Sequence, residues 1–373
     1  MRPILALLGL TAALAPVVLA PPSHAQAPAP VLVTPQRATA GTPPLVLYAG
    51  LNKSRGYVVG SKLSESGLHR FMGDGGRPDA RRDTLWQHLG WSTPRISGLA
   101  VDPSDPARRY IASGNGAMVS TTGGAAWRIP TDWRVTEVQD VAADAAGRVV
   151  IGTAYGPWRS ADRGATWAEA ADGIPLMQRY TQDVEMDAAR AGRVVAATDG
   201  GVYVSDDGAA SWRRASAALS VQDVAQSASA PETWYAATRG RGLWRSTDGA
   251  RTWTPTATAF RDSTFYGVAV DPYDARRVAA ASWNAGVVVS ADGGRTWTAR
   301  TRGLPVARLY CVVFDANRAG RLWAATVERG IFRSDDMGGT CRYAGMTGTL
   351  VFDLVFLPDA PGAAFATPDA SAR

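Results

Sequence analysis

Short hydrophobic runs recur along this chain, and turns rich in Gly and Asp separate them. The segment from Gln182 to Trp212 contains four such runs, each with the length of a β-strand. They cover residues 183–186, 193–198, 201–205 and 212–214. Asp199-Gly200 and residues 206–210 lie between runs, and these residue types tolerate the backbone angles of tight turns. The segment therefore predicts four antiparallel strands joined by hairpins.

This unit repeats, and each copy contains an eight-residue segment that we call the box. A box begins with Ser, has Asp at its third position and ends with Trp. The six boxes are Ser120–Trp127, Ser160–Trp167, Ser205–Trp212, Ser246–Trp253, Ser290–Trp297 and Ser334–Cys341. Thr122 replaces the Asp in the first box and Cys341 replaces the Trp in the last, so we expect these two turns to be weaker. A period of about 40 to 45 residues with several short strands is typical of a β-propeller, in which four-stranded sheets surround a channel.

A seventh, less regular unit precedes the six. Leu45–Ala49 matches a second strand, Gly67–Arg70 matches a third strand, and Trp86 stands one period before Trp127. This unit lacks a first strand, but Phe352–Phe356 near the chain end matches one. The sequence thus predicts an all-β, seven-bladed β-propeller with four antiparallel strands per blade, closed by pairing of the C-terminal strand with the N-terminal blade. Such closure removes exposed sheet edges.

The N-terminal residues have the features of an export signal. The mostly apolar run Ile4–Ala20 precedes Ala25-Gln26-Ala27, which fits a small-x-small cleavage site. We expect residues 1–27 to be a cleavable signal peptide, residues 28–44, rich in Pro, Ala and Thr, to be a linker, and residues 45–373 to form the propeller. The protein would then be exported to the periplasm, the cell surface or the medium. No later stretch predicts a transmembrane span.

Composition argues against several functions. The formal net charge of +6 comes from scattered Arg without a basic run, which does not indicate nucleic-acid binding. His69 and His88 are the two histidines outside the export signal, so we expect no histidine metal site, no cofactor and no Ser-His-Asp nucleophile. A disulfide between Cys311 and Cys341 would suit an exported protein, but the repeat places them at opposite edges of one blade. We expect a monomer.

The box Ser-x-Asp-x-Gly-x-Thr-Trp, as in Ser290–Trp297, resembles the Asp box, also called the BNR repeat. Sialidases, xyloglucan-cleaving endoglucanases, sortilin-type receptors and photosystem II stability and assembly factors share this repeat. The resemblance implies a propeller whose boxes lie at the face away from the active sites of those families. We expect the box carboxylates to bond turn N–H groups and the Trp rings to pack between sheets. These structural residues are Asp162, Trp167, Asp207, Trp212, Asp248, Trp253, Asp292, Trp297 and Asp336.

Carboxylates recur on the predicted first strands, which line the axis of a propeller. Four occupy equivalent positions: Asp140, Asp183, Asp223 and Asp353. Mutual repulsion would raise some of their pKa values and permit acid and base roles; alternatively, each Asp bonds the backbone of the next blade. Repetition at equivalent positions favours the structural interpretation, because catalysis needs an asymmetric pair. Asp199 is a further candidate, since Thr198–Tyr203 is similar to a segment that carries a catalytic carboxylate in the xyloglucan-cleaving enzymes.

Arginines recur in the loops that precede the predicted first strands. They are Arg95, Arg134, Arg179, Arg261 and Arg308, and the aromatic residues Trp133, Tyr180 and Trp283 lie among them. This set suits an acidic protein segment or a glycan, since guanidinium groups bind carboxylates and aromatic faces stack on rings. Solvated loop arginines without a ligand are the alternative.

Two functions follow from these observations. The first is an exported, non-catalytic propeller that serves as a protein- or glycan-binding scaffold, such as an assembly or stability factor. In size and layout the chain is most similar to the photosystem II assembly factors, which implies a single propeller without a catalytic set. The alternative is a sialidase-like or xyloglucanase-like glycoside hydrolase that uses two channel carboxylates such as Asp140 and Asp183.

Overall fold

The structure, a computed structural model, describes five stretches of the chain. They are residues 45–53, 66–73, 85–89, 95–256 and 258–359. Within these stretches no helix is long and apolar enough to cross a lipid bilayer. The expected signal peptide (1–27) and linker (28–44) lie outside the described residues and stay predictions.

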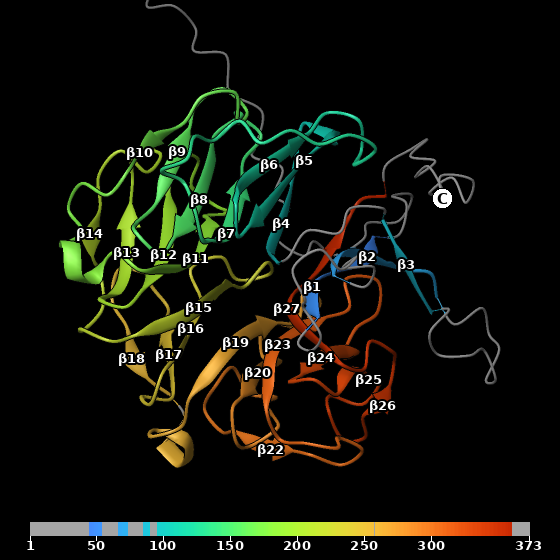
Figure 1. The fold of residues 1–373 in the computed structure, drawn as a ribbon. Helices are drawn as coiled ribbons and strands as arrows, with labels where there is room; N and C mark the ends of the chain where they lie inside the picture. Colours follow the sequence, from blue (N-terminus) through green and yellow to red (C-terminus); the bar gives the residue numbers. More distant parts are fainter. Residues whose placement is uncertain (1–44, 54–65, 74–84, 90–94, 257, 360–373) are drawn as a thin grey trace, which may run out of the picture.

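The described strands form seven sheets around one axis (Figure 1), and we number these blades in chain order. Blade 1 contains β27 (Thr349–Leu357), β1 (Val46–Lys53), β2 (Gly67–Phe71) and β3 (Trp86–His88); blade 2 contains β4 (Ile96–Asp102), β5 (Asp105–Ser113) and β6 (Gly116–Ser120); blade 3 contains β7 (Val138–Ala143), β8 (Val149–Thr153), β9 (Trp158–Ser160) and β10 (Ala168–Glu169). Blade 4 contains β11 (Thr181–Met186), β12 (Val194–Thr198), β13 (Gly201–Ser205) and β14 (Arg213–Arg214); blade 5 contains β15 (Val221–Gln226), β16 (Trp234–Thr238), β17 (Leu243–Ser246) and β18 (Thr254–Pro255). Blade 6 contains β19 (Phe265–Val270), β20 (Val278–Ser282), β21 (Val287–Ser290) and β22 (Thr298–Arg300); blade 7 contains β23 (Leu309–Phe314), β24 (Leu322–Thr326), β25 (Gly330–Ser334) and β26 (Arg342–Tyr343).

The predicted all-β, seven-bladed architecture is therefore confirmed, and one blade is less complete than the others. In blade 2 the described fourth strand is reduced to a single bridge between Val119 and Arg128. Pro130 follows two residues later and has no N–H with which to extend the ladder. Two short 3₁₀ turns, Leu176–Gln178 and Thr258–Phe260, lie in loops between blades.

The C-terminal strand β27 belongs to the N-terminal blade. It pairs antiparallel with β1, from Val46 opposite Leu357 to Lys53 opposite Thr349. The strand is longer than the predicted segment 352–356, because its pairing continues along the whole of β1. Residues from both ends of the described chain thus form one sheet.

Burial follows the position of each strand in its blade. The second strand β12 is buried at every residue, because both faces of a blade pack against neighbouring blades. In the first strand β11, by contrast, Val184 and Met186 are buried whereas Asp183 and Glu185 keep part of their surface exposed. First strands therefore bring polar side chains to the axis of the ring.

The box forms a hydrogen-bonded hairpin turn, as Asp292 illustrates. Its Oδ1 accepts bonds from the N–H groups of Arg295 (3.0 Å) and Thr296 (2.9 Å), and its Oδ2 accepts one from Thr296 Oγ1 (2.6 Å). Ser290 Oγ accepts the N–H of Gly294 at 2.8 Å. These bonds, chiefly those from Thr296, lower the pKa of Asp292 to about 2. In the first box Thr122 Oγ1 accepts the N–H of Ala126 alone, at 2.9 Å.

The last residue of a box packs between neighbouring sheets. Trp212 is buried, and its Nε1 donates to the carbonyl of Ala170 in the preceding blade at 2.6 Å. Cys341 is buried at the equivalent place in blade 7, while Cys311 lies on the first strand β23. Both thiols are free, so the disulfide that we considered is not formed.

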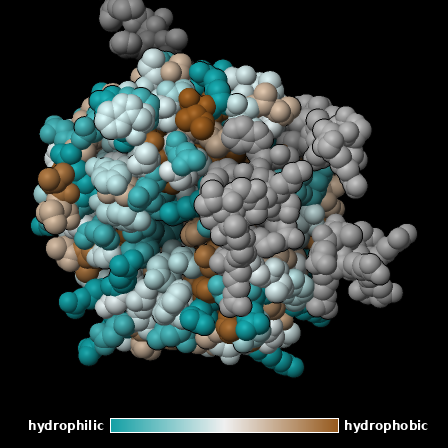
Figure 2. Space-filling model, viewed as in Figure 1, coloured by the Kyte–Doolittle hydropathy of each residue, from teal (hydrophilic) through white to brown (hydrophobic). Residues whose placement is uncertain are grey.

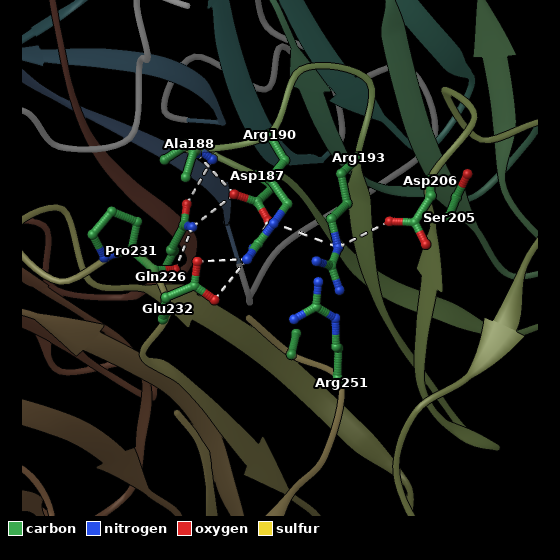
Figure 3. A network of polar contacts seen from close by, with 12 residues as sticks. Asp187, Ala188, Arg190, Arg193, Ser205, Asp206, Gln226, Pro231, Glu232 and Arg251 are labelled. Atoms are coloured by element: carbon green, nitrogen blue, oxygen red, sulfur yellow. Dashed lines mark hydrogen bonds and ion pairs between the residues drawn. The ribbon is translucent and has the colours of Figure 1, made fainter. Parts of the chain in front are cut away.

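All boxes lie at one end of the ring, which we call the box end. There the backbone N–H of each box bonds the turn between the first and second strands, for example Gly208 to Gly192 at 2.7 Å. Figure 3 shows a polar network at this end, in which Gln226 of blade 5 donates to Asp187 of blade 4 at 3.0 Å. Asp187 also accepts a bond from Arg190, at 3.2 Å. The network joins two blades and occupies the polar groups there.

The substitution Asp292→Ala removes the acceptor of four turn hydrogen bonds, the three described above and one from Ser290 Oγ at 2.8 Å. We expect the free energy of unfolding, measured by urea denaturation at neutral pH, to fall by about 1–2 kcal/mol. Arg295→Ala is the matched control, because this exposed side chain lies in the same turn and should change stability by less than about 0.5 kcal/mol. Equal stability of the two variants would contradict a structural role for the box carboxylate.

Candidate binding site at the channel mouth

The loops that precede the first strands lie together at the end opposite the boxes. In five blades a backbone hydrogen bond joins this loop to the turn between the second and third strands. The donor–acceptor pairs are Ala154–Glu137, Asp199–Tyr180, Arg239–Ser220, Trp283–Thr264 and Val327–Arg308. We call this the loop end. It carries all five arginines that the sequence singled out, because each precedes a first strand.

The five loop arginines have different surroundings. Three form ion pairs with nearby carboxylates: Arg134 with Asp132 (2.6 Å), Arg179 with Glu169 (2.9 Å) and Arg261 with Asp262 (3.3 Å). Arg95 and Arg308 form no ion pair with the described residues. Among these five arginines, the charge available to a ligand is therefore largest at Arg95 and Arg308.

Arg95 and Arg308 lie against aromatic rings near the axis. The Arg95 guanidinium is 4.7 Å from the centre of the Phe352 ring and donates to Gln139 Oε1 at 2.5 Å. The Arg308 guanidinium is 5.7 Å from the centre of the Trp283 ring. Cation–π contacts hold such side chains in place without neutralising their charge.

The residues at the channel mouth divide into an aromatic half and an amide half. They lie one position before the aligned Asp on each first strand, where a register shift leaves them unpaired and turned to the channel. The aromatic half consists of Tyr266, Tyr310 and Phe352, and the amide half consists of Gln139, Gln182 and Gln222 together with the hydroxyl residue Ser97. Ring centres are 5.0 Å apart for Tyr266 and Tyr310 and 5.7 Å apart for Tyr310 and Phe352. Trp283 extends the aromatic half, 5.4 Å from Tyr266.

One level deeper, the four first-strand aspartates reach the next blade. Asp140 Oδ2 accepts the N–H of Val184 (3.2 Å), Asp183 Oδ2 that of Val224 (2.8 Å), Asp223 Oδ2 that of Val268 (2.6 Å), and Asp353 that of Leu99. These bonds are the ones that the structural interpretation of the repeat predicts. Glycine fills the place in blade 2, since a Cβ at Gly98 would overlap the carboxylate of Asp140.

Three of these carboxyl groups also bond one another. Asp183 lies between Asp140 and Asp223 and forms a side-chain hydrogen bond with each. A hydrogen bond between two carboxyl groups requires a proton. Burial raises the pKa of all three, and that of Asp140 and Asp223 well above the usual range, which makes these two the donors and Asp183 the shared acceptor. Burial also raises the pKa of Asp353 to about 7.

A fifth carboxyl group, Glu185, lies two positions beyond Asp183 on the same strand, and our sequence reasoning missed it. The other six blades have a small apolar residue at this level: Ala100, Ala142, Ala225, Ala269, Val313 and Val355. No hydrogen bond or ion pair joins Glu185 to the described residues. Burial, with the charges of Asp183 and Asp187, raises its pKa well above the usual range. The alignment of the repeats contains this exception, so it was visible in the sequence.

These levels line one open cavity of about 540 Å³ along the axis, which also includes Tyr180 and Arg239. Asp199 lies apart from it, exposed in the turn after β12, where its Oδ1 accepts a bond from Ser220 Oγ at 2.7 Å. Trp133 is exposed in the loop before β7, outside the cavity. In the described part of the chain, no group of three or more His, Cys, Asp or Glu residues is placed to hold a metal ion.

On the face shown in Figure 2, the coloured surface is mainly hydrophilic, with hydrophobic residues in small scattered groups. On the face shown there, recognition would depend on polar and aromatic groups rather than on one large apolar patch.

The sequence matches no protein-family model and no curated protein. The structure is similar to the GH74 enzyme of Niastella koreensis, with a TM-score of 0.59 and 19% identity over 82% of this chain and 54% of that one. It is also similar to the GH74 xyloglucanase of Xanthomonas campestris, with a TM-score of 0.59 and 20% identity over 80% of this chain and 51% of that one. This chain thus spans about half the length of these two proteins.

A third similar structure is YCF48 of Cyanidioschyzon merolae, with a TM-score of 0.52 and 16% identity over 66% of this chain and 84% of that one. At such identities the similarity establishes the propeller fold alone. The matches include both GH74 enzymes and YCF48, so the fold does not determine the function of this chain.

The shared protons of the channel predict a particular pH dependence of stability. Folding raises the pKa of these carboxyl groups, so their contribution is complete below their ordinary pKa of 3.8 and is lost as the pH rises through the higher folded values. Asp223→Asn keeps both a donor to Asp183 and an acceptor for Val268 without a titrating proton. Urea denaturation between about pH 5 and 8 measures how the free energy of unfolding decreases with pH. In Asp223→Asn this decrease should be less steep, by up to about 1.4 kcal/mol per pH unit.

Asp183→Asn is the contrasting variant, because Asp183 only accepts hydrogen bonds and an amide N–H would face donors. We expect a loss of about 1–3 kcal/mol that persists across the pH range. Identical pH profiles for Asp223→Asn, Asp183→Asn and the unsubstituted protein would show that these carboxyl groups do not share protons.

Proposed function

We propose that this protein is an exported, non-catalytic binding propeller that captures a protein or glycan partner at its loop end. The observation that carries the proposal is the mouth of the channel, where an aromatic half faces an amide half beside the unpaired cation Arg95, while Arg308 lies against Trp283 at the same end of the ring. Aromatic faces, amide groups and guanidinium groups together suit a ligand that has apolar surfaces, hydrogen-bonding edges and negative charge.

The bonding of the channel aspartates supports a non-catalytic role. Asp140, Asp183 and Asp223 each accept a backbone N–H of the next blade, and that bond fixes their orientation. A general acid or base must instead present its carboxyl group to a substrate and exchange a proton with it. The loop arginines in ion pairs, Arg134, Arg179 and Arg261, would contribute mainly to the rate and salt dependence of partner association.

The experiment is a binding comparison at the two ends of the ring. Labelled acidic peptides and a panel of neutral and acidic oligosaccharides serve as probes. Arg308→Glu and Trp283→Ala should each lower the affinity for the best-binding probe at least tenfold, because the first reverses a free charge and the second removes an aromatic face. Arg295→Glu makes the same charge change at the box end and should leave affinity unchanged. Equal affinities for all variants would contradict the proposal.

A glycoside hydrolase is the second candidate, and Glu185 is the observation that favours it. This residue breaks the repeat and its charge interacts with that of Asp183, so the two form an asymmetric carboxyl pair on the channel. Turnover of sialosides or β-glucans that Asp183→Asn abolishes and Asp292→Asn preserves would establish the enzyme. Absence of turnover with intact probe binding would favour the scaffold.

A further inference from the structure

Glu185 is the one side chain at its level of the channel that departs from the pattern of small apolar residues. It contributes nothing to the bonds between blades, unlike the four aspartates above it. The Ala side chains of blades 2, 3, 5 and 6 leave open space at this level, and this space belongs to the same cavity as the mouth. A carboxyl group in such a place is positioned to meet a ligand.

The charges of the channel are ordered along its axis. The cations Arg95 and Arg239 lie at the mouth, and the carboxyl groups of Asp183 and Glu185 lie inside. Asp183 and Glu185 stand two positions apart on β11, so both carboxyl groups face the channel at adjacent levels. A ligand that fits this order has a cationic inner end and an anionic outer end.

The distance between these levels limits the size of the ligand. The level of Arg95 and the level of Glu185 are five positions apart along a first strand, one of them in the bulge, which corresponds to about 13–16 Å. An extended polypeptide spans about 3.3–3.6 Å per residue, so about four residues bridge the two levels. The aromatic and amide halves would face the side chains and peptide groups of such a segment.

We propose that the channel binds the free amino terminus of an extended peptide, with its ammonium group beside Glu185 and Asp183 and its carboxylates at Arg95 and Arg239. The inference rests on the proposed function, since the ligand enters through the loop end, and it names the partner class as a polypeptide with an unblocked amino end. It distinguishes this ligand from a glycan, which has no ammonium group unless it contains an unacetylated amino sugar.

The test uses calorimetric titration of the purified full chain with tetra-alanine in three forms: free at both ends, N-acetylated, and C-amidated. The free peptide should bind, acetylation should weaken binding at least tenfold, and amidation should weaken it several-fold. Glu185→Gln should remove the preference for the free amine. Asp172→Asn, which neutralises an exposed carboxylate outside the cavity, should preserve that preference.

Glu185→Ala is a second variant that reproduces the residue of four other blades, and its unfolding curve checks that the fold is intact. The proposal is overturned if the acetylated peptide binds as tightly as the free one, if both Glu185 variants keep the preference, or if no form binds. The first two results leave the proposed binding at the loop end standing.

Discussion

The hydrogen bond between a first-strand aspartate and the backbone of the next blade is the interaction on which the channel depends. A ring of sheets must hold its inner strands at a fixed spacing although these strands share no ladder. Asp140, Asp183 and Asp223 meet this requirement in three successive blades. At Gly98 and Gly267 the absence of a side chain lets neighbouring strands approach closely instead. Carboxyl groups and glycines thus serve the same geometric purpose.

This arrangement has an electrostatic consequence. Carboxyl groups at one level of a narrow channel repel one another unless protons are shared. The hydrogen bonds of Asp183 with both neighbours provide that sharing. Glu185 lies outside this system, so its carboxyl group is the member of the channel that remains available to a ligand. The structural carboxyl group of Asp183 and the proposed ligand-binding carboxyl group of Glu185 therefore occupy adjacent levels of the same strand.

The two ends of the ring differ in how far their polar groups are already bonded within the protein. At the box end, polar groups such as Asp187 and Arg190 are bonded to their own and neighbouring blades, so little remains to meet a partner. At the loop end, the bulge in each first strand turns one side chain to the channel, and the blades differ there in residue type. Variation among equivalent positions produces the aromatic and amide halves.

Most of the fold could be predicted from the sequence, since the box period and the unmatched first strand at 352–356 determine blade number and the pairing of β27. The reduced fourth strand of blade 2 depends on Pro130, which lacks the N–H that would extend the ladder. This effect is predictable from the sequence, but our sequence analysis did not include it. The ion pairs of Arg134, Arg179 and Arg261 could not be predicted, because loop side chains find partners according to local geometry. Glu185 was overlooked because attention to repeated residues hides the one that is not repeated.

Carbon-13 NMR titration of the Asp side-chain carboxyl groups, assigned with single Asp→Asn variants, measures the shared protons directly. The account predicts that Asp140 and Asp223 keep their protons to a higher pH than Asp183 does. Ionisation of all three with pKa values near the ordinary 3.8 would contradict it, and with it the distinction between the structural carboxyl groups and Glu185.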